Sequence, residues 1–264
     1  MYGRHGVRKY IDNFFRFKPL LTELVSRDIK IKYRRSVLGV LWTVLNPLCM
    51  MVILSIVFSN IFKFDVENFP LYVLSGQVIF NFFNDATTSS MTSILFNGSL
   101  IKKVYVPKYL FVLARIVSSF INLVASLSAL LVMMVATRAE LHWEIILSVI
   151  PLTLVVGFSL GIGLILAALT VKFRDIMHLY AVFTTGLMYL TPVIYPMSIL
   201  PETIKRIVLL NPLTNYLVMF RDVMFNHTLP TAGALVIGLV EMVLALALGL
   251  WIFYKKQDEF ILDL

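Results

Sequence analysis

The sequence predicts an all-α membrane protein: six transmembrane helices, an N-terminal amphipathic interface helix before them, and short re-entrant helices between spans five and six. Three observations support this fold class. Apolar residues make up 59% of the 264 residues and charged residues only 14%, whereas soluble domains have about 45–50% and 25%. Many of the apolar residues fall in runs long enough to cross a bilayer as a helix. Lysine and arginine are concentrated in alternate connections between these runs.

The leader, residues 1–36, is basic, and its second half has helical periodicity. Pro19 suits the first turn of a helix, which needs no N–H donor there, so we expect a helix to begin at this residue. Apolar and basic residues then recur on different faces, with Leu20, Leu21, Leu24, Val25 and Ile29 on one and Arg27, Lys30 and Arg34 mainly on the other. This pattern favours a helix lying in the membrane interface. The alternative is a solvated basic leader that only fixes topology.

The spans occupy residues 37–254, at about 37–62, 70–96, 109–136, 144–171, 176–194 and 231–254. Pro47 should kink the first span or begin a new helical section. Asn97 and Gly98 form a stop signal after the second span. Gly157 and Gly161 in the fourth have the spacing of close helix packing. Before the sixth span, prolines interrupt apolar stretches that are too short to cross, which predicts the re-entrant helices: Pro192, Pro196, Pro201, Pro212 and Pro230.

The distribution of positive charge predicts that both ends of the chain are cytoplasmic. The segments 1–36, 97–108, 172–175 and 255–264 hold 17 Lys and Arg residues, and the segments 63–69, 137–143 and 195–230 hold 5. Lysine and arginine in short loops stay on the cytoplasmic side of a membrane. We therefore expect one multi-pass domain in the cytoplasmic membrane, with residues 255–264 as a cytoplasmic tail.

The second half of the second span is unusually polar. Asn81, Asp85, Thr88 or Ser89, and Thr92 repeat every three or four residues, so they share one helix face. A polar face is costly in lipid, and this one must meet another helix or a water-filled passage. Two interpretations stay open, namely hydrogen bonding between helices and the wall of a translocation path.

Titratable residues inside the spans are few: Asp85, Arg115 and Glu241. Asp85 and Arg115 either pair with each other or snorkel separately to the interface. Three isolated charges make a poor proton relay, so an external energy source is the simpler hypothesis for any transport.

Motifs of nucleotide, metal and acyl-transfer enzymes are missing from the sequence. It holds no G-x-x-x-x-G-K-[ST] phosphate loop. The histidines, His5, His142, His178 and His227, have no paired metal-ligand spacing. We therefore expect no catalytic, cofactor-binding or metal site on this chain.

Aromatic side chains in the spans suit a sugar-conducting path, because their faces stack on the apolar faces of sugar rings. Lipid contact or core packing is the alternative for each. Together with the polar face they give the channel-lining candidates: Tyr72, Phe80, Asn81, Phe83, Asp85, Ser89, Thr92, Phe183, Tyr189 and Tyr195.

Three segments in order carry a resemblance to a known family. They are Asp28 to Gly39 followed by Trp42 and Asn46-Pro47, then Phe173-Arg174-Asp175-Ile176, and then Thr191 to Tyr195 followed by Leu200-Pro201, Asn211-Pro212 and Arg221. Together they resemble the permease subunits of type-2 ABC exporters, in the branch that moves lipid-linked polysaccharides such as O antigen, capsule or teichoic acid.

The resemblance implies an assembly in which two copies of the permease form a channel for a lipid-linked glycan among membrane lipids. Two copies of a separate ATPase subunit bind ATP and Mg, and no nucleic acid takes part. It implies ATPase-coupling positions at Leu20, Leu24, Arg27, Lys30, Arg34, Arg35, Lys102, Lys103 and Pro107. It implies an outer gate at Pro196, Pro201, Asn211, Pro212 and Arg221. An exporter of small amphiphiles or drugs is the alternative, and a membrane enzyme acting on polyprenyl-linked substrates is a third hypothesis.

Overall fold

The computed structural model describes the backbone of residues 5–61, 66, 68–140 and 142–264, and the side chains of residues 16–58, 66, 68–140 and 142–264. Within these residues the secondary structure is helical and includes no strand, which confirms the all-α class. Most of the outer loop expected at 63–69 lies outside the described residues.

The helices follow one another along the whole described chain. They are α1 (His5–Lys32), α2 (Trp42–Ile61), α3 (Phe69–Phe96), α4 (Gly98–Lys103), α5 (Tyr109–Ala136), α6 (Val149–Thr170), α7 (Ile176–Tyr189), α8 (Glu202–Leu209), α9 (Pro212–Phe225), α10 (Ala232–Lys256) and α11 (Phe260–Asp263), with 3-10 turns η1 (Gly39–Leu41), η2 (Trp143–Ser148) and η3 (Met197–Ile199). Helix α3 ends at the predicted stop signal: Asn97 alone separates it from α4, which begins at Gly98.

Four helical stretches are long and apolar enough to cross a membrane: Gly39–Phe58, Tyr109–Ala136, Trp143–Thr170 and Ala232–Lys256. They coincide with the first, third, fourth and sixth predicted spans. The second predicted span is α3, which has 28 residues but a polar second half. The fifth, α7, has 14 residues and ends at Tyr189 instead of Ile194, because Pro192 cannot continue a helix and restricts the residue before it.

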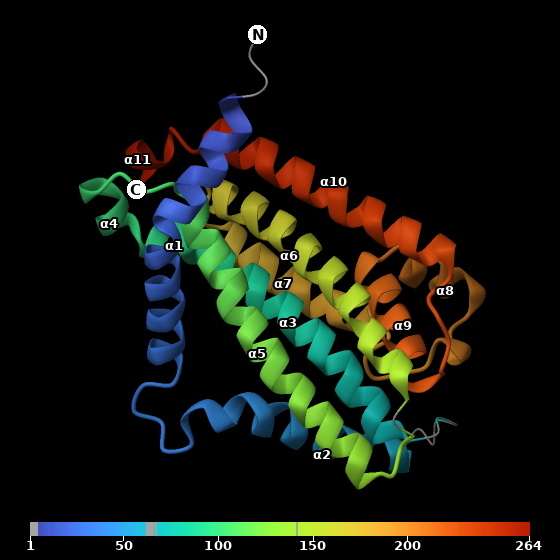
Figure 1. Ribbon diagram of the computed structural model, residues 1–264. Helices are drawn as coiled ribbons and strands as arrows, with labels where there is room; N and C mark the ends of the chain where they lie inside the picture. The colour runs from blue at the N-terminus through green and yellow to red at the C-terminus, as the bar shows by residue number, and fades with distance from the viewer. Residues whose placement is uncertain (1–4, 62–65, 67, 141) are drawn as a thin grey trace.

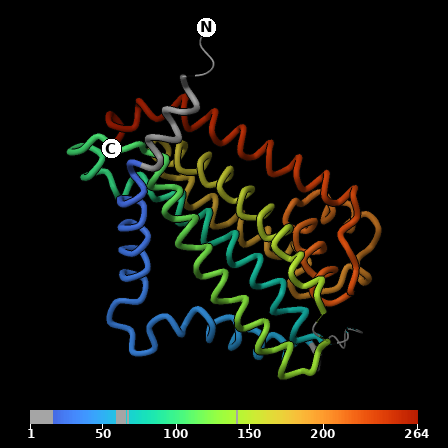
Figure 2. Tube along the Cα trace, viewed as in Figure 1, coloured from blue at the N-terminus to red at the C-terminus, as the bar shows by residue number. Residues whose placement is uncertain are grey.

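The central helix of the bundle is α3, which lies between α5 and α6 and also packs on α2 (Figures 1 and 2). Its apolar side chains, including Leu74, Ile79 and Phe82, are buried in the main core. This position explains how a half-polar helix is accommodated, since most of its surface meets protein instead of lipid. Tyr180 of α7 donates to Thr87 Oγ1 at 2.6 Å, outside the predicted polar face, and on that face Asp85 accepts from Ser119 Oγ of α5 at 2.8 Å, so part of the polar face serves hydrogen bonding between helices.

Pro19 does not act as the sequence predicted, because it lies inside α1, which begins at His5. Pro47 lies inside α2 (Trp42–Ile61), so it does not begin a new helical section, and a kink there stays a prediction. A proline inside a helix leaves the carbonyl four residues earlier without its N–H partner. For Pro47 that carbonyl belongs to Thr43, and Ser126 Oγ donates to it at 3.3 Å. The same hydroxyl lies 3.0 Å from the Asn122 carbonyl of α5, so its single hydrogen is shared between the two acceptors and replaces the missing backbone donor in part.

The closest helix packing joins α6 to α10. A Cβ added at Gly161 would lie 2.4 Å from the carbonyl carbon of Ala245, and one added at Gly249 would lie 2.4 Å from the carbonyl oxygen of Gly161. The prediction of close packing at the Gly157–Gly161 motif is confirmed, and its partner is the α10 backbone.

Replacing Gly161 with alanine is expected to lower the free energy of unfolding by about 1–3 kcal/mol, because the added methyl forces two helix backbones apart. Thermal unfolding of the purified protein in detergent measures the effect. Gly233→Ala is the matched control, since a Cβ there meets nothing within 4 Å. Equal melting temperatures for the two variants would contradict the packing described.

Candidate functional site

A buried carboxylate joins the N-terminal helix to the bundle. Helix α1 crosses the bundle near the end that carries α4 and α11 (Figure 1), and it packs on α5. Asp28 on α1 is only 7% exposed. Its Oδ2 lies 3.2 Å from Arg115 Nη1 of α5, and its Oδ1 lies 3.2 Å from Arg27 Nη2. One carboxylate therefore connects α1 to α5 through an ion pair shielded from solvent.

A second polar cluster lies around Asp85 on α3. Lys32 Nζ, at the end of α1, is 3.2 Å from each carboxylate oxygen. From α5, Ser119 Oγ donates to Oδ2 at 2.8 Å and Asn122 Nδ2 at 3.4 Å. Tyr33 donates to Asn122 Oδ1 at 3.2 Å. Burial, and less strongly the charge of Asp85, raise the pKa of the Tyr33 phenol.

The predicted pairing of Asp85 with Arg115 is wrong, because among the described side chains each takes its ionic partner from α1: Lys32 for Asp85 and Asp28 for Arg115. Their snorkelling to the membrane interface stays a prediction. The sequence gives no spacing that relates α1 to α3 and α5, so these partners were not predictable from it.

A cavity of about 520 Å³ opens beside the Asp85 cluster, between the start of α2, α3 and α5. Its lining combines charged, amide and aromatic groups, among them Lys32, Trp42, Asn46, Asn81, Asp85 and Asn122. Such a lining suits a molecule that has both polar and apolar parts.

A buried arginine holds the opposite part of the bundle together. Arg221 on α9 is 7% exposed. Its Nε donates to Ser75 Oγ at 3.1 Å, its Nη1 to the Pro192 carbonyl at 2.7 Å, and its Nη2 to the carbonyls of Tyr72 at 2.8 Å and Val193 at 3.2 Å. Its Cζ lies 3.5 Å from the centre of the Tyr72 ring. We call Arg221 and these four partners the arginine clamp.

The clamp depends on arginine because guanidinium presents five N–H donors in a fixed fork. All its acceptors are neutral, and among the described side chains no carboxylate pairs with it. Gly76 leaves the required room, since a Cβ there would lie 2.9 Å from Arg221 Nη2 and from Val193 Cα. The clamp thus ties α9, the start of α3 and the segment after α7 into one unit.

Two neighbouring contacts extend this unit. Asn211 caps α9 by accepting from the Leu213 amide at 3.1 Å, and it donates to Thr191 Oγ1 at 2.9 Å. Tyr72 Oη donates to the Tyr195 carbonyl at 3.0 Å. Through the clamp, Arg221 of the predicted gate also contacts Tyr72 of the predicted channel. Ser75, Gly76 and the carbonyl acceptors were missed, because nothing in their spacing indicates an arginine partner.

The family model described as ABC-2 type transporter matches residues 19–225. The chain belongs to the ABC-2 type transporter family. It is 28% identical over 254 residues to the O-antigen export system permease protein RfbA of Myxococcus xanthus, covering 96% of this chain and 98% of that protein. A Klebsiella pneumoniae protein of the same name is 26% identical over 91% and 93% of the two chains. The polysialic acid transport protein KpsM of Escherichia coli is 23% identical over 91% and 95%.

In this ABC-2 chain the predicted coupling residues lie on and around α1 and α4. Leu24 is buried and Leu20 partly buried against a core that includes α5 residues, and Arg27 is partly buried. The basic residues Lys30, Arg34, Arg35, Lys102 and Lys103 are exposed, and Pro107 is half-buried between α4 and α5. Exposed cations beside a packed apolar face are typical of a surface available to a partner.

Lys108 links the α4–α5 connection of the ABC-2 chain to its C-terminal segment. Its ammonium donates to the Gln257 carbonyl and lies 5.7 Å from the centre of the Phe260 ring. Burial lowers the pKa of this ammonium, and the nearby Asp258 carboxylate partly offsets the effect. A pocket of about 560 Å³ is lined by residues of α4, by Arg174 and by Leu264. The two basic connections 97–108 and 172–175 therefore meet the C-terminal tail at one end of the bundle.

The remaining channel candidates of the ABC-2 chain occupy two environments. Phe80 and Phe83 are buried in the core, and the Phe83 ring stacks on Phe158 with centroids 5.9 Å apart. Ser89, Thr92 and Tyr195 are partly exposed, and Asn81, Phe183 and Tyr189 are exposed. Asn81, Phe183 and Tyr189 therefore lie on the surface of the single chain, where a substrate or a second chain can reach them.

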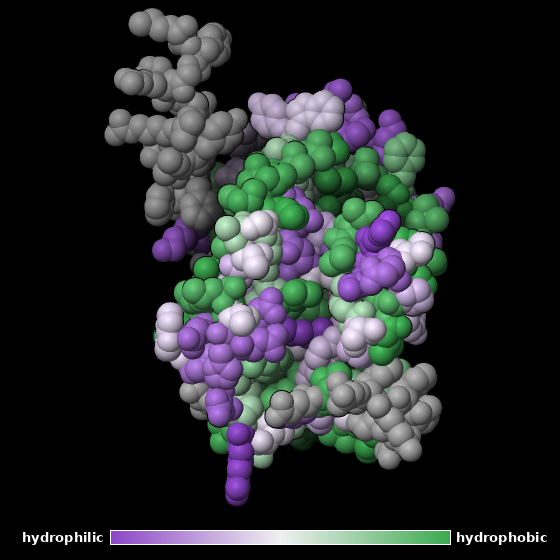
Figure 3. Space-filling view, turned by 90° about the vertical axis from the view of Figure 1, so that its right-hand side faces the viewer, coloured by the Kyte–Doolittle hydropathy of each residue, from purple (hydrophilic) through white to green (hydrophobic). Residues whose placement is uncertain are grey.

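The three prolines of the predicted outer gate all stand at helix starts. Pro196 precedes η3, Pro201 precedes α8, and Pro212 is at the beginning of α9. The side of the molecule that carries α8 and α9, at the right in Figure 1, faces the viewer in Figure 3 as a mosaic of hydrophilic and apolar side chains. Short helices with a mixed surface suit the edge of a membrane better than its hydrocarbon core.

Proposed function

We propose that this chain is the membrane-spanning permease subunit of an ATP-driven exporter that carries a lipid-linked polysaccharide across the cytoplasmic membrane. The observation that carries the proposal is the similarity along 96% of this chain and 98% of an O-antigen export permease. Similarity to a capsule polysaccharide export protein of Neisseria meningitidis extends the substrate class from O antigen to capsule.

The proposed topology has six spans and two cytoplasmic ends. Helices α3 and α7 are the two spans that we add to the four strongly apolar ones. Helix α3 has 28 residues and lies at the centre of the bundle, and α7 forms a span together with the segment that follows it to Ile194. Helix α7 alone reaches about 21 Å, short of the roughly 30 Å of a hydrocarbon core. We propose that α8 and α9 return to the outer side as a re-entrant hairpin. The meeting of the basic connections at one end of the bundle supports this orientation.

The proposed assembly is a pair of identical permeases with two copies of a separate ATPase subunit, which bind ATP and Mg. The sequence holds no phosphate loop of its own, which agrees with this division. The exposed basic residues of α1 and α4 are the proposed contacts to the ATPase. Asp28 then passes movement of α1 to α5 through Arg115.

The proposed path runs along the accessible channel candidates: Asn81, Phe183, Tyr189 and Tyr195, with Tyr72 and Asp85 beside them. The aromatic faces would stack on sugar rings, and the polar groups would exchange hydrogen bonds with hydroxyls. The arginine clamp holds the proposed gate hairpin against α3. For the path to open, the hairpin either moves together with the start of α3, to which the clamp binds it, or the hydrogen bonds of Arg221 break.

Deleting the gene is expected to leave finished glycan inside the cell, and restoring it is expected to bring glycan back to the surface. Fractionated glycan measured with and without spheroplast lysis gives the result. Sensitivity to small amphiphiles without glycan retention would favour the drug exporter instead. Turnover of a polyprenyl-linked substrate by the purified chain without ATP or a partner would favour the enzyme.

A further inference from the structure

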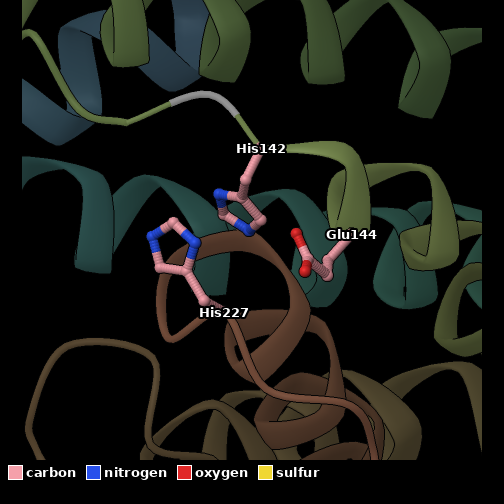
Figure 4. Close-up of side chains that lie close together, drawn as sticks. All are labelled: His142, Glu144 and His227. Carbon is pink, nitrogen blue, oxygen red and sulfur yellow. The ribbon is translucent and has the colours of Figure 1, made fainter.

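Two histidines and a glutamate from two separate connections converge on the end of the bundle away from α4. His142 and Glu144 lie between α5 and α6, and His227 follows α9. Their ligand atoms all lie within 4.8 Å of one another. Figure 4 shows the His142 ring between the His227 ring and the Glu144 carboxylate. The His142 and His227 ring centroids are 3.6 Å apart.

The contacts of His142 show which nitrogen is available. Its Nε2 lies 2.8 Å from the Val223 carbonyl, and its Nδ1 lies 3.3 Å from the Glu140 carbonyl. A carbonyl only accepts, so the shorter contact assigns the single N–H of the neutral ring to Nε2. Nδ1 then carries the lone pair that can bind a cation, and the Glu140 carbonyl oxygen 3.3 Å away cannot donate to it. Carbonyl groups orient metal-binding histidines in this way.

The second histidine lies directly beside the first. The His227 ring packs against His142 with centroids 3.6 Å apart, and Glu140 Oε2 lies 3.6 Å from His227 Nε2. Nitrogen and carboxylate groups from both connections therefore gather at one point, as the ligands of a metal ion do.

We propose that His142, Glu144 and His227 bind a divalent transition metal, best matched by Zn²⁺, and thereby join the α5–α6 connection to the α9–α10 connection. Two imidazoles and a carboxylate are a common zinc ligand set, and Glu140 or water completes four-coordination. Tetrahedral zinc places its ligand atoms about 3.4 Å apart, so the group must contract. His227 is well placed for this, since its side chain is 42% exposed. The metal would fix α9, and with it the arginine clamp, from the outer end.

The test is zinc binding by the full-length permease, purified with a tag that contains no histidine. After dialysis against excess Zn²⁺ and removal of free metal, we expect one zinc per chain by elemental analysis and a higher melting temperature. His227→Ala and Glu144→Gln should each weaken zinc affinity at least tenfold and abolish the thermal shift. These two variants avoid the Val223 contact of His142, so they are expected to fold.

His178→Ala is the matched control, because His178 is an exposed histidine on α7. It should keep the full zinc content and thermal shift. The proposal is overturned if the unaltered protein retains no zinc, or if His227→Ala and Glu144→Gln bind zinc as tightly as His178→Ala. Because the readouts are metal content and melting temperature, they do not depend on which substrate the permease moves.

Discussion

Arg221→Leu is expected to abolish export and to lower the free energy of unfolding by about 3 kcal/mol or more. The change removes the guanidinium from four buried acceptors on α3 and the 190–195 segment. The carbonyls of Tyr72 and Pro192 keep the hydroxyls of Ser75 and Tyr72 as donors, whereas the Val193 carbonyl loses its side-chain donor. Each buried group left unsatisfied costs about 1–3 kcal/mol, and the space left by the guanidinium adds to the loss. Arg221→Lys should recover the effect only in part, because one ammonium has three donors and lacks the planar fork. Glycan export in cells and thermal unfolding in detergent measure the two effects.

Arg206→Leu is the matched control for this prediction, since Arg206 is an exposed arginine on the neighbouring α8. It should leave melting temperature and export near those of the unaltered protein. Melting temperatures within 1–2 °C of each other for Arg221→Leu and Arg206→Leu would show that the clamp does not hold the hairpin.

Asp28→Ala is expected to disconnect the N-terminal helix from α5 and to reduce export at least tenfold while ATP hydrolysis continues. The substitution leaves Arg115 without its carboxylate partner in a site shielded from solvent, and breaking a buried ion pair costs about 3–5 kcal/mol. ATPase rate and export, measured on the same reconstituted complex, separate loss of coupling from loss of the complex.

Glu23→Ala controls for the loss of an acidic side chain on the same helix, because Glu23 is exposed. A double-mutant cycle with Arg115→Ala isolates the pair, and we expect a coupling energy of about 1–3 kcal/mol. Additive effects of Asp28→Ala and Arg115→Ala would mean that the ion pair does not link the two helices.

Local signals in the sequence predicted most of the helices and the places where they end. Apolar runs located the four strongly apolar spans, and Asn97-Gly98 located the end of α3. The Gly157–Gly161 spacing predicted close packing because it depends on one helix face. Pro19 was misjudged, since α1 already begins at His5 and contains it. Pro47 does not begin a new helical section, and the Thr43 carbonyl that lost its backbone donor lies 3.3 Å from Ser126 Oγ, a residue 79 positions after Pro47.

The sequence predicted fewer of the contacts in the candidate site. Asp85 and Arg115 stood out as charges inside spans, but their partners Lys32 and Asp28 come from a helix that no periodicity places against α3 or α5. The histidines were dismissed for lack of spacing, although folding brings two of them together from 85 positions apart. Long-range pairing depends on how helices stack, and spacing within one helix does not encode it.

The most direct test of the central claim is reconstitution of this chain in proteoliposomes with its proposed ATPase partner. We predict a stable complex that moves a lipid-linked glycan to the opposite leaflet only when ATP is present, with hydrolysis stimulated by that glycan. Failure of the two proteins to co-purify, or glycan movement and ATPase activity that are indifferent to each other, would contradict the account.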